Sequence, residues 1–177
     1  MPFPAPHFAI GLYIAENGQP NGLRRIADGE FDAEILRLSE LMKSVPGQVF
    51  LRIGYEFDGA WNLGQSDAGN YIAAYRRIVD IIRADGATNG VFVWQASASI
   101  LDDLIERQHE DIRLWFPGND YVDWLALSWF SLPDATAIVD GAYEAKKPME
   151  LANEVVVFAR ELNKPVLIAE SAPQGYD

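Results

Sequence analysis

Two apolar stretches of this sequence each end in a glutamate, and this repeated arrangement constrains the fold more than any other feature. Residues 49–53 (VFLRI) are apolar except for Arg52 and lead through Gly54 to Glu56. Residues 165–169 (PVLIA) lead directly to Glu170. Continuous apolar runs of this length are typical of strands buried on both faces of a parallel sheet. We therefore expect two such strands, each with a carboxylate at its carboxyl end.

The rest of the chain alternates between candidate strands and candidate helices. Further strands are predicted over residues 8–15, 90–95 and 121–129. Apolar residues at helical spacing predict helices over residues 31–42, 67–86 and 148–162, with a short candidate over 101–108. The stretch that ends at Gly29 is rich in Gly, Asn and Pro and is predicted to be a loop. This alternation predicts βαβ units and a parallel sheet.

Five parallel strands do not close an eight-stranded barrel, which typically needs about 250 residues. The chain has 177 residues, and only seven follow Glu170. We expect an α/β fold, a partial (β/α)8 TIM barrel with strands missing at both ends. The alternative is a complete five-stranded doubly wound sheet, which a last strand without a following helix fits less well.

Two carboxylates at strand ends suit one reaction in particular. Active sites of parallel α/β folds gather at the carboxyl ends of the strands. Glycoside hydrolysis needs two facing carboxylates, one to protonate the leaving oxygen and one to attack the sugar or activate water. The alternative for each Glu alone is a strand-end residue that pairs with an Arg or caps a helix.

The residues around Glu56 support a sugar site. Charged, hydroxyl and indole groups crowd the stretch that follows the strand, a mixture suited to a polyhydroxylated ring. The candidate substrate-binding residues are Arg52, Tyr55, Asp58, Trp61, Trp94, Trp129 and Phe130. For Trp94, at the end of its strand, a position in the core is the alternative.

Composition excludes several other classes. A net charge of −12 disfavours binding to nucleic acid or to an anionic membrane surface. The absence of Cys and the presence of two His leave no thiolate or histidine metal centre, so we expect no metal and no cofactor. Residues 1–7 (MPFPAPH) lack the features of a signal peptide, and no apolar stretch approaches membrane-spanning length. No obligate protein partner is inferred.

Three motifs resemble glycoside hydrolase family 26, the β-mannanase family. Residues 52–61 (RIGYEFDGAW) are similar to its acid/base motif R-P-x-H-E-M-N-G-x-W. Residues 115–124 (WFPGNDYVDW) are similar to its Y-P-G-D-x-Y-V-D-W segment, and residues 164–170 (KPVLIAE) to its nucleophile strand K-P-x-x-I-x-E. The three motifs occur in the family's order across most of the chain.

The resemblance implies that residues 1–177 are a fragment of one catalytic domain and supply strands three to seven of a retaining, endo-acting (β/α)8 glycanase. By motif position Glu56 would be the general acid/base and Glu170 the nucleophile. Trp61 would stack on sugar, and Arg52 would hold a carboxylate. The partner would be a β-linked polysaccharide, mannan or a related β-glycan, and secretion would be expected. Retention requires the two carboxyl groups to lie about 5–5.5 Å apart.

The sequence departs from the family pattern at four positions. Tyr55 replaces a His, Asp58 an Asn, Ser128 an Asp and Phe130 a Tyr. Like-charge repulsion from Asp58 would raise the pKa of Glu56, which suits an acid catalyst. The changes leave the reaction class standing but weaken the case for mannan as the substrate, and those at Tyr55 and Phe130 leave open a carbohydrate-binding relative without turnover. We expect the isolated chain to be inactive.

Overall fold

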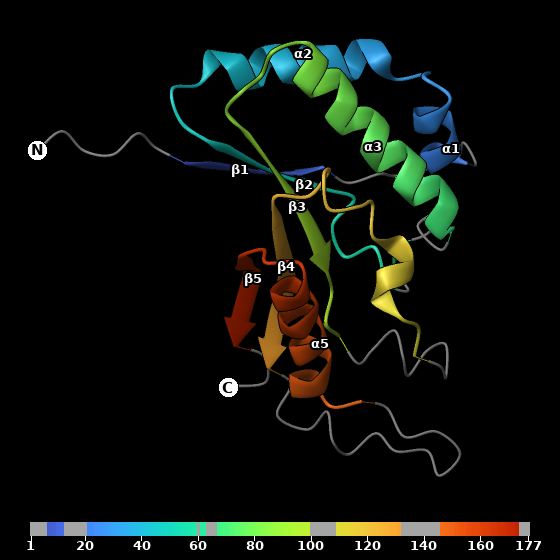
Figure 1. The fold of residues 1–177 in the computed structure, drawn as a ribbon, viewed down its shortest axis with the longest axis vertical. Helices are drawn as coiled ribbons and strands as arrows, with labels where there is room; N and C mark the ends of the chain where they lie inside the picture. The colour runs from blue at the N-terminus through green and yellow to red at the C-terminus, as the bar shows by residue number, and fades with distance from the viewer. Residues whose placement is uncertain are drawn as a thin grey trace, which may run out of the picture.

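A parallel sheet with the strand order β1-β2-β3-β4-β5 forms the centre of the molecule (Figure 1). The computed structural model describes residues 7–12, 21–59, 61–62, 67–99, 109–131 and 146–173. The strands are β1 (Phe8–Leu12), β2 (Val49–Ile53), β3 (Gly90–Ala96), β4 (Trp124–Ser131) and β5 (Val166–Pro173). All four strand pairs are parallel. The predicted fold class, a partial (β/α) barrel that the chain does not close, is confirmed.

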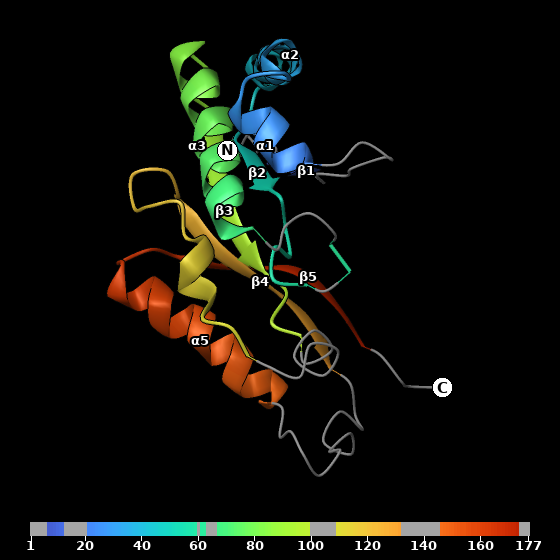
Figure 2. The ribbon, with the colours of Figure 1, turned by 90° about the vertical axis from the view of Figure 1, so that its right-hand side faces the viewer.

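The helices cover one face of the sheet. They are α1 (Gly22–Ala27), α2 (Asp32–Ser44), α3 (Ala68–Ala84), the 3₁₀ helix η1 (Ile112–Trp115) and α5 (Pro148–Glu161). Figure 2 shows α3 and α5 on the same side of the strands. The sheet contributes Leu51, Trp94 and Leu125 to the core between these layers, where each is fully buried. One face of the sheet is therefore filled by packing, and the other is left for the side chains that point away from the helices.

Local signals explain where two of the helices begin. Asp67 precedes α3, and its Oδ1 accepts a hydrogen bond from the backbone N–H of Asn70 at 3.0 Å. Asp is a preferred residue at this position because its side-chain oxygen satisfies a backbone N–H that has no partner within the helix. Helix α5 begins at Pro148, and the Glu150 side chain accepts from the backbone N–H of Lys147 at 2.7 Å. Both starts leave the following apolar stripe facing the sheet.

Some predicted boundaries were wrong. Helix α1 lies in the stretch predicted as a loop, because the buried Leu23 packs its single turn and a half against the core despite flanking Gly and Asn. Strand β4 begins at Trp124 and not at 121, because Tyr121 closes a turn onto the carbonyl of Gly118 at 3.0 Å. The structure also has η1 in a stretch for which no helix was predicted. The helix candidate over 101–108 and the end of the first predicted strand, 13–15, lie outside the described residues.

We predict that the isolated chain self-associates through β5. Within the described residues β5 pairs only with β4, so its other edge presents unpaired backbone groups, and Ile168 on it is 59% exposed. Ile168→Lys should shift the chain toward monomer in size-exclusion chromatography with light scattering. Met149→Lys on α5, where the side chain is 65% exposed, is the control and should change nothing. A monomeric wild-type chain would contradict the prediction.

Candidate active site

Four polar side chains from four strands lie on the face of the sheet opposite the helices: Arg52, Gln95, Ser128 and Glu170. The strand register brings them together. Arg52 pairs with Val93, which lies two residues before Gln95. Gln95 pairs with Ala126, which lies two residues before Ser128, and Ser128 pairs with Glu170. Paired residues of a parallel sheet, and every second residue along a strand, point to the same face. The polar row therefore crosses the sheet near the carboxyl ends of its strands.

An irregularity in β5 determines the direction of Glu170. Leu127 pairs with Ile168 but Ser128 pairs with Glu170, so Ala169 is an extra residue opposite β4. Bulges of this kind re-aim side chains and are frequent near active sites. Without the extra residue Ser128 would pair with Ala169, and Glu170 would point to the helix-covered face.

A continuous chain of hydrogen bonds joins the two predicted catalytic carboxylates. Nη1 of Arg52 donates to Oε1 of Glu170 at 2.5 Å and to Oε1 of Gln95 at 3.0 Å. Nε2 of Gln95 donates to Oγ of Ser128 at 3.0 Å, and this hydroxyl donates to Oε1 of Glu56 at 2.5 Å. We call these five side chains the carboxylate relay. It places Glu56 and Glu170 at the same edge of the sheet.

The backbone of Glu56 is held in an unusual conformation. Its φ is 53°, in the left-handed region that non-glycine residues seldom adopt. Its N–H donates to the carbonyl of Gln95 at 2.9 Å, and its carbonyl accepts from Nδ2 of the buried Asn62 at 2.6 Å. These bonds tie the loop after β2 to the end of β3 and so fix the direction in which the Glu56 side chain leaves the sheet.

Trp61 lies beside Glu56. Its indole Nε1 donates to Oε2 of Glu56 at 3.0 Å, so the two oxygens of this carboxylate have different partners, Ser128 and Trp61. The Trp61 side chain is 42% exposed although it is large and apolar. An exposed ring beside a hydrogen-bonded carboxylate is suited to stack on a sugar.

Arg52 occupies a space shaped by two neighbours. Its Cζ lies 4.9 Å from the centre of the Tyr55 ring, in cation–π geometry. On the neighbouring strand β1, a Cβ added to Gly11 would lie 2.9 Å from Nη2 of Arg52 and 3.1 Å from Cε1 of Tyr55. A larger residue at position 11 would therefore displace the guanidinium or the ring.

Asp58 is held away from the open face. Its Oδ1 accepts from the backbone N–H of Ser97 at 2.6 Å, which joins the loop after β2 to the end of β3. Burial, opposed by the Ser97 hydrogen bonds, raises the pKa of Asp58 to about 6, and Glu56 adds a smaller repulsion. This carboxyl group therefore braces the loop after β2 against the end of β3.

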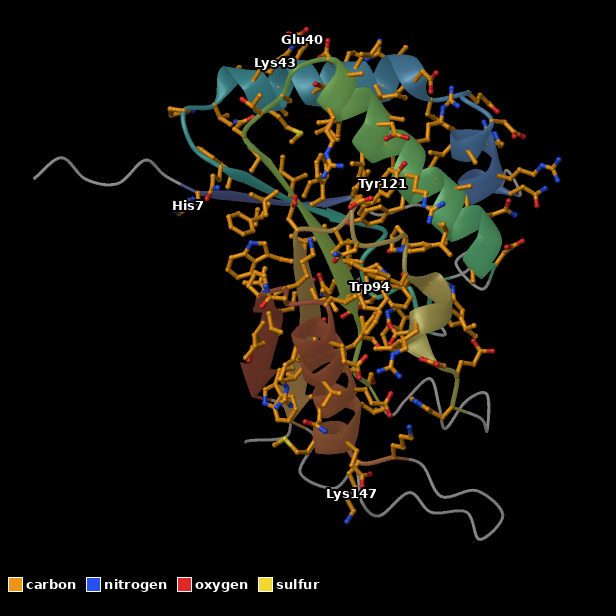
Figure 3. The ribbon with its side chains drawn as sticks, viewed as in Figure 1. His7, Glu40, Lys43, Trp94, Tyr121 and Lys147 are labelled. Atoms are coloured by element: carbon orange, nitrogen blue, oxygen red, sulfur yellow. The ribbon has the colours of Figure 1, made fainter. Side chains whose placement is uncertain are left out.

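The predicted aromatic residues divide between the two faces. Trp94 is fully buried on the helix side, where it stacks on Phe57 at 4.6 Å between ring centres and donates from Nε1 to the carbonyl of Trp115 at 3.2 Å (Figure 3). Its alternative role in the core is the one the structure shows. Trp129 is one residue beyond Ser128, faces the helix side and packs against the core. Phe130 is two residues beyond Ser128 and shares the face of the relay.

Sequence reasoning missed two residues of this site. Gln95 was assigned only to a strand, although a fully buried amide at a strand end is a signal because buried polar groups need partners. Gly11 stands within an apolar strand, where a glycine often marks close approach of another group. In the described part of the chain, no cluster of His, Cys, Asp or Glu could hold a metal ion, and no helix is long and apolar enough to cross a bilayer.

The fold is a partial (β/α) barrel. The chain is similar in structure to a modular endo-β-1,4-mannanase of glycoside hydrolase family 26 from Cellulomonas fimi, with a TM-score of 0.70 at 17% identity, over 94% of this chain and 40% of that one. The resemblance to family 26 predicted from the three motifs is confirmed at the level of fold. No family model matches the chain.

In sequence the chain is similar to two curated proteins that are named β-1,3-xylanases. It is 30% identical to the β-1,3-xylanase TXYA of a Vibrio species over 172 residues, which are 97% of this chain and 33% of the relative. It is 28% identical to a β-1,3-xylanase of an Alcaligenes species over 172 residues, 97% of this chain and 32% of that protein. The chain thus spans about a third of the length of these relatives.

We predict that Asp58 makes stability fall as pH rises. Its raised pKa means that the folded state keeps a proton that the unfolded state releases, so stability is highest below about pH 4 and is lost as pH rises through about 6. Asp58→Asn keeps an acceptor for Ser97 and should raise the free energy of unfolding at pH 7 by at most about 3 kcal/mol, and by little at pH 4.

Urea denaturation at several pH values measures this effect. Asp80→Asn, at an exposed position of α3, is the matched control and should leave the pH dependence unchanged. Equal destabilisation by Asp58→Asn at pH 4 and pH 7 would show that the amide disturbs the loop and that the buried carboxyl is not the cause.

Proposed function

We propose that the chain is part of the catalytic domain of a retaining, endo-acting glycoside hydrolase that cleaves a β-linked polysaccharide by double displacement. The observation that carries the proposal is the carboxylate relay, which joins Glu56 and Glu170 at the carboxyl edge of the sheet. The fold of the mannanases and the sequence similarity to two xylanases support the same class.

In this mechanism Glu170 is the nucleophile and Glu56 the acid/base. The Arg52 guanidinium donates to Oε1 of Glu170, and a cationic donor favours the anionic form that attacks the anomeric carbon. Glu56 first protonates the leaving oxygen. It then removes a proton from the water that releases the glycosyl group from Glu170.

The surrounding side chains divide the remaining tasks. Trp61 offers its exposed ring to a sugar next to Glu56. Tyr55 and Phe130 are proposed to border the same sugar, Tyr55 through its position beside Arg52 and Phe130 through its position on the open face. Asp58, Trp94 and Trp129 support the site from behind and are not proposed to touch substrate.

β-1,3-Xylan is the first substrate to test, because the curated relatives that cover 97% of the chain are named β-1,3-xylanases. Mannan is the second, because the structural neighbour is a mannanase. Pentose units lack the C6 hydroxymethyl group of mannose, so comparison of the two polymers asks whether the site has room for that group.

We predict that Glu56→Gln and Glu170→Gln, made in the protein that carries this chain, lower kcat/KM on the preferred polymer by about 10²–10⁴-fold or more. Reducing-sugar release measures the loss, and NMR of the first anomer formed should show retention. Glu40→Gln on α2 is the control, since Glu40 lies far from the relay (Figure 3).

Azide assigns the two roles. Added azide should restore activity to Glu170→Ala and give a glycosyl azide of inverted anomeric configuration. It should restore activity to Glu56→Ala and give a glycosyl azide of retained configuration. Activity that survives Glu170→Ala without azide would remove Glu170 from its assignment. A wild-type protein that binds the polymers but releases no sugar would favour the binding relative suggested by Tyr55 and Phe130.

A further inference from the structure

The middle of the carboxylate relay consists of two neutral side chains that the reaction scheme does not use. Gln95 is fully buried and Ser128 is 1% exposed. Buried amides and hydroxyls cost free energy unless they are hydrogen-bonded. Here each side chain has two partners. Gln95 is bonded to Arg52 and Ser128, and Ser128 is bonded to Gln95 and Glu56. The buried polar groups are therefore satisfied only as a connected set.

Arg52 determines the direction of the two hydrogen bonds that Gln95 makes. A guanidinium can only donate, so the oxygen of Gln95 faces it and the amide nitrogen faces Ser128. The Ser128 hydroxyl accepts from that nitrogen, and its single proton is directed at Oε1 of Glu56. An ionised Glu56 accepts this proton. A Glu56 protonated on Oε1 leaves the hydroxyl without its acceptor.

We propose that Gln95 and Ser128 are positioning residues that favour the ionised form of Glu56 and make it sensitive to the charge on Glu170. The proposal rests on the proposed function and adds a task for two residues outside the catalytic pair. While Glu170 is a free carboxylate it shares Nη1 of Arg52 with Gln95.

When Glu170 carries the glycosyl group as an ester, its charge is lost and Arg52 donates more strongly to Gln95. Hydrogen bonds in a chain polarise one another, so the Ser128 bond to Glu56 strengthens. Glu56 is then favoured as an anion at the step where it acts as a base.

Other charged groups surround Glu56 and have to be separated from the relay. Asp58 lies in the same loop, Arg52 on β2 and Glu170 on β5, and Tyr55 precedes Glu56 in the chain. Burial raises the pKa of Asp58 to about 6, so its contribution is removed by measuring every variant in an Asp58→Asn background.

Trp61 provides a readout that does not need turnover. Its indole N–H donates to Oε2 of Glu56, so the NMR shift of this proton follows the ionisation of Glu56. Trp61→Phe identifies the signal, and Glu56→Gln should abolish its titration. Ser128→Ala should raise the midpoint of this titration, which reports the ionisation of Glu56, by about one pH unit. This is the size expected when a carboxylate loses one charge-assisted hydrogen-bond donor.

Two further variants test the chain of contacts. Ser128→Thr keeps the hydroxyl and should restore the wild-type midpoint. Gln95→Leu removes both inner contacts and should raise the midpoint by a smaller amount. Glu170→Gln should shift the midpoint of the Glu56 titration more in the wild-type protein than in Ser128→Ala. Once the relay is cut, only the direct electrostatic effect of Glu170 on Glu56 remains.

Activity gives the second readout. The alkaline limb of kcat/KM should move to higher pH by the same amount in Ser128→Ala, with KM for the polymer changed less than twofold. Failure of the wild-type protein to cleave any polymer would overturn the proposed function while the indole titration still tests the relay. Midpoints in Ser128→Ala and Gln95→Leu that equal that of the wild type, in folded proteins by circular dichroism, would overturn the relay.

Discussion

The ion pair between Arg52 and Glu170 is the contact on which the carboxyl edge of this sheet depends. The two residues are 118 positions apart, yet Nη1 and Oε1 lie 2.5 Å from each other. The Arg52 side chain is only 15% exposed, so its charge needs a nearby anion. Glu170 can supply one only if β5 is paired and bulged as observed. The ion pair thus ties the last strand to the second one through the two strands between them.

Around this pair the protein uses neutral groups and space in place of more charge. Gly11 leaves room for the guanidinium, Tyr55 covers it, and Gln95 accepts from it. A third charged group here would either compete for Arg52 or remain unpaired at low dielectric. The nearby acid, Asp58, is instead turned toward a backbone N–H, which separates its proton uptake from the open face.

The sequence was sufficient for the strands, the helical stripes and the two glutamates, because each is written in consecutive residues. It did not reveal Gln95, Gly11 or the bulge, since their importance depends on which residues of neighbouring strands are paired. The two alternatives for Trp94 stayed open for a related reason. A strand that is apolar on both faces carries no alternation, so nothing local tells which side a terminal Trp faces. Helix α1 was missed because Leu23, which anchors it, acts through contacts remote in sequence.

The extra residue Ala169 has a consequence for anyone who aligns or redesigns this segment. Val166 of β5 pairs with Leu125 of β4, and Glu170 pairs with Ser128. Glu170 lies four positions after Val166, whereas Ser128 lies three positions after Leu125. A protein with an uninterrupted ladder would need its acid one position earlier to reach the same place. Comparison by position number alone would then match this carboxylate with a residue of the opposite face of the sheet, so a gap of one residue in an alignment would have a structural meaning.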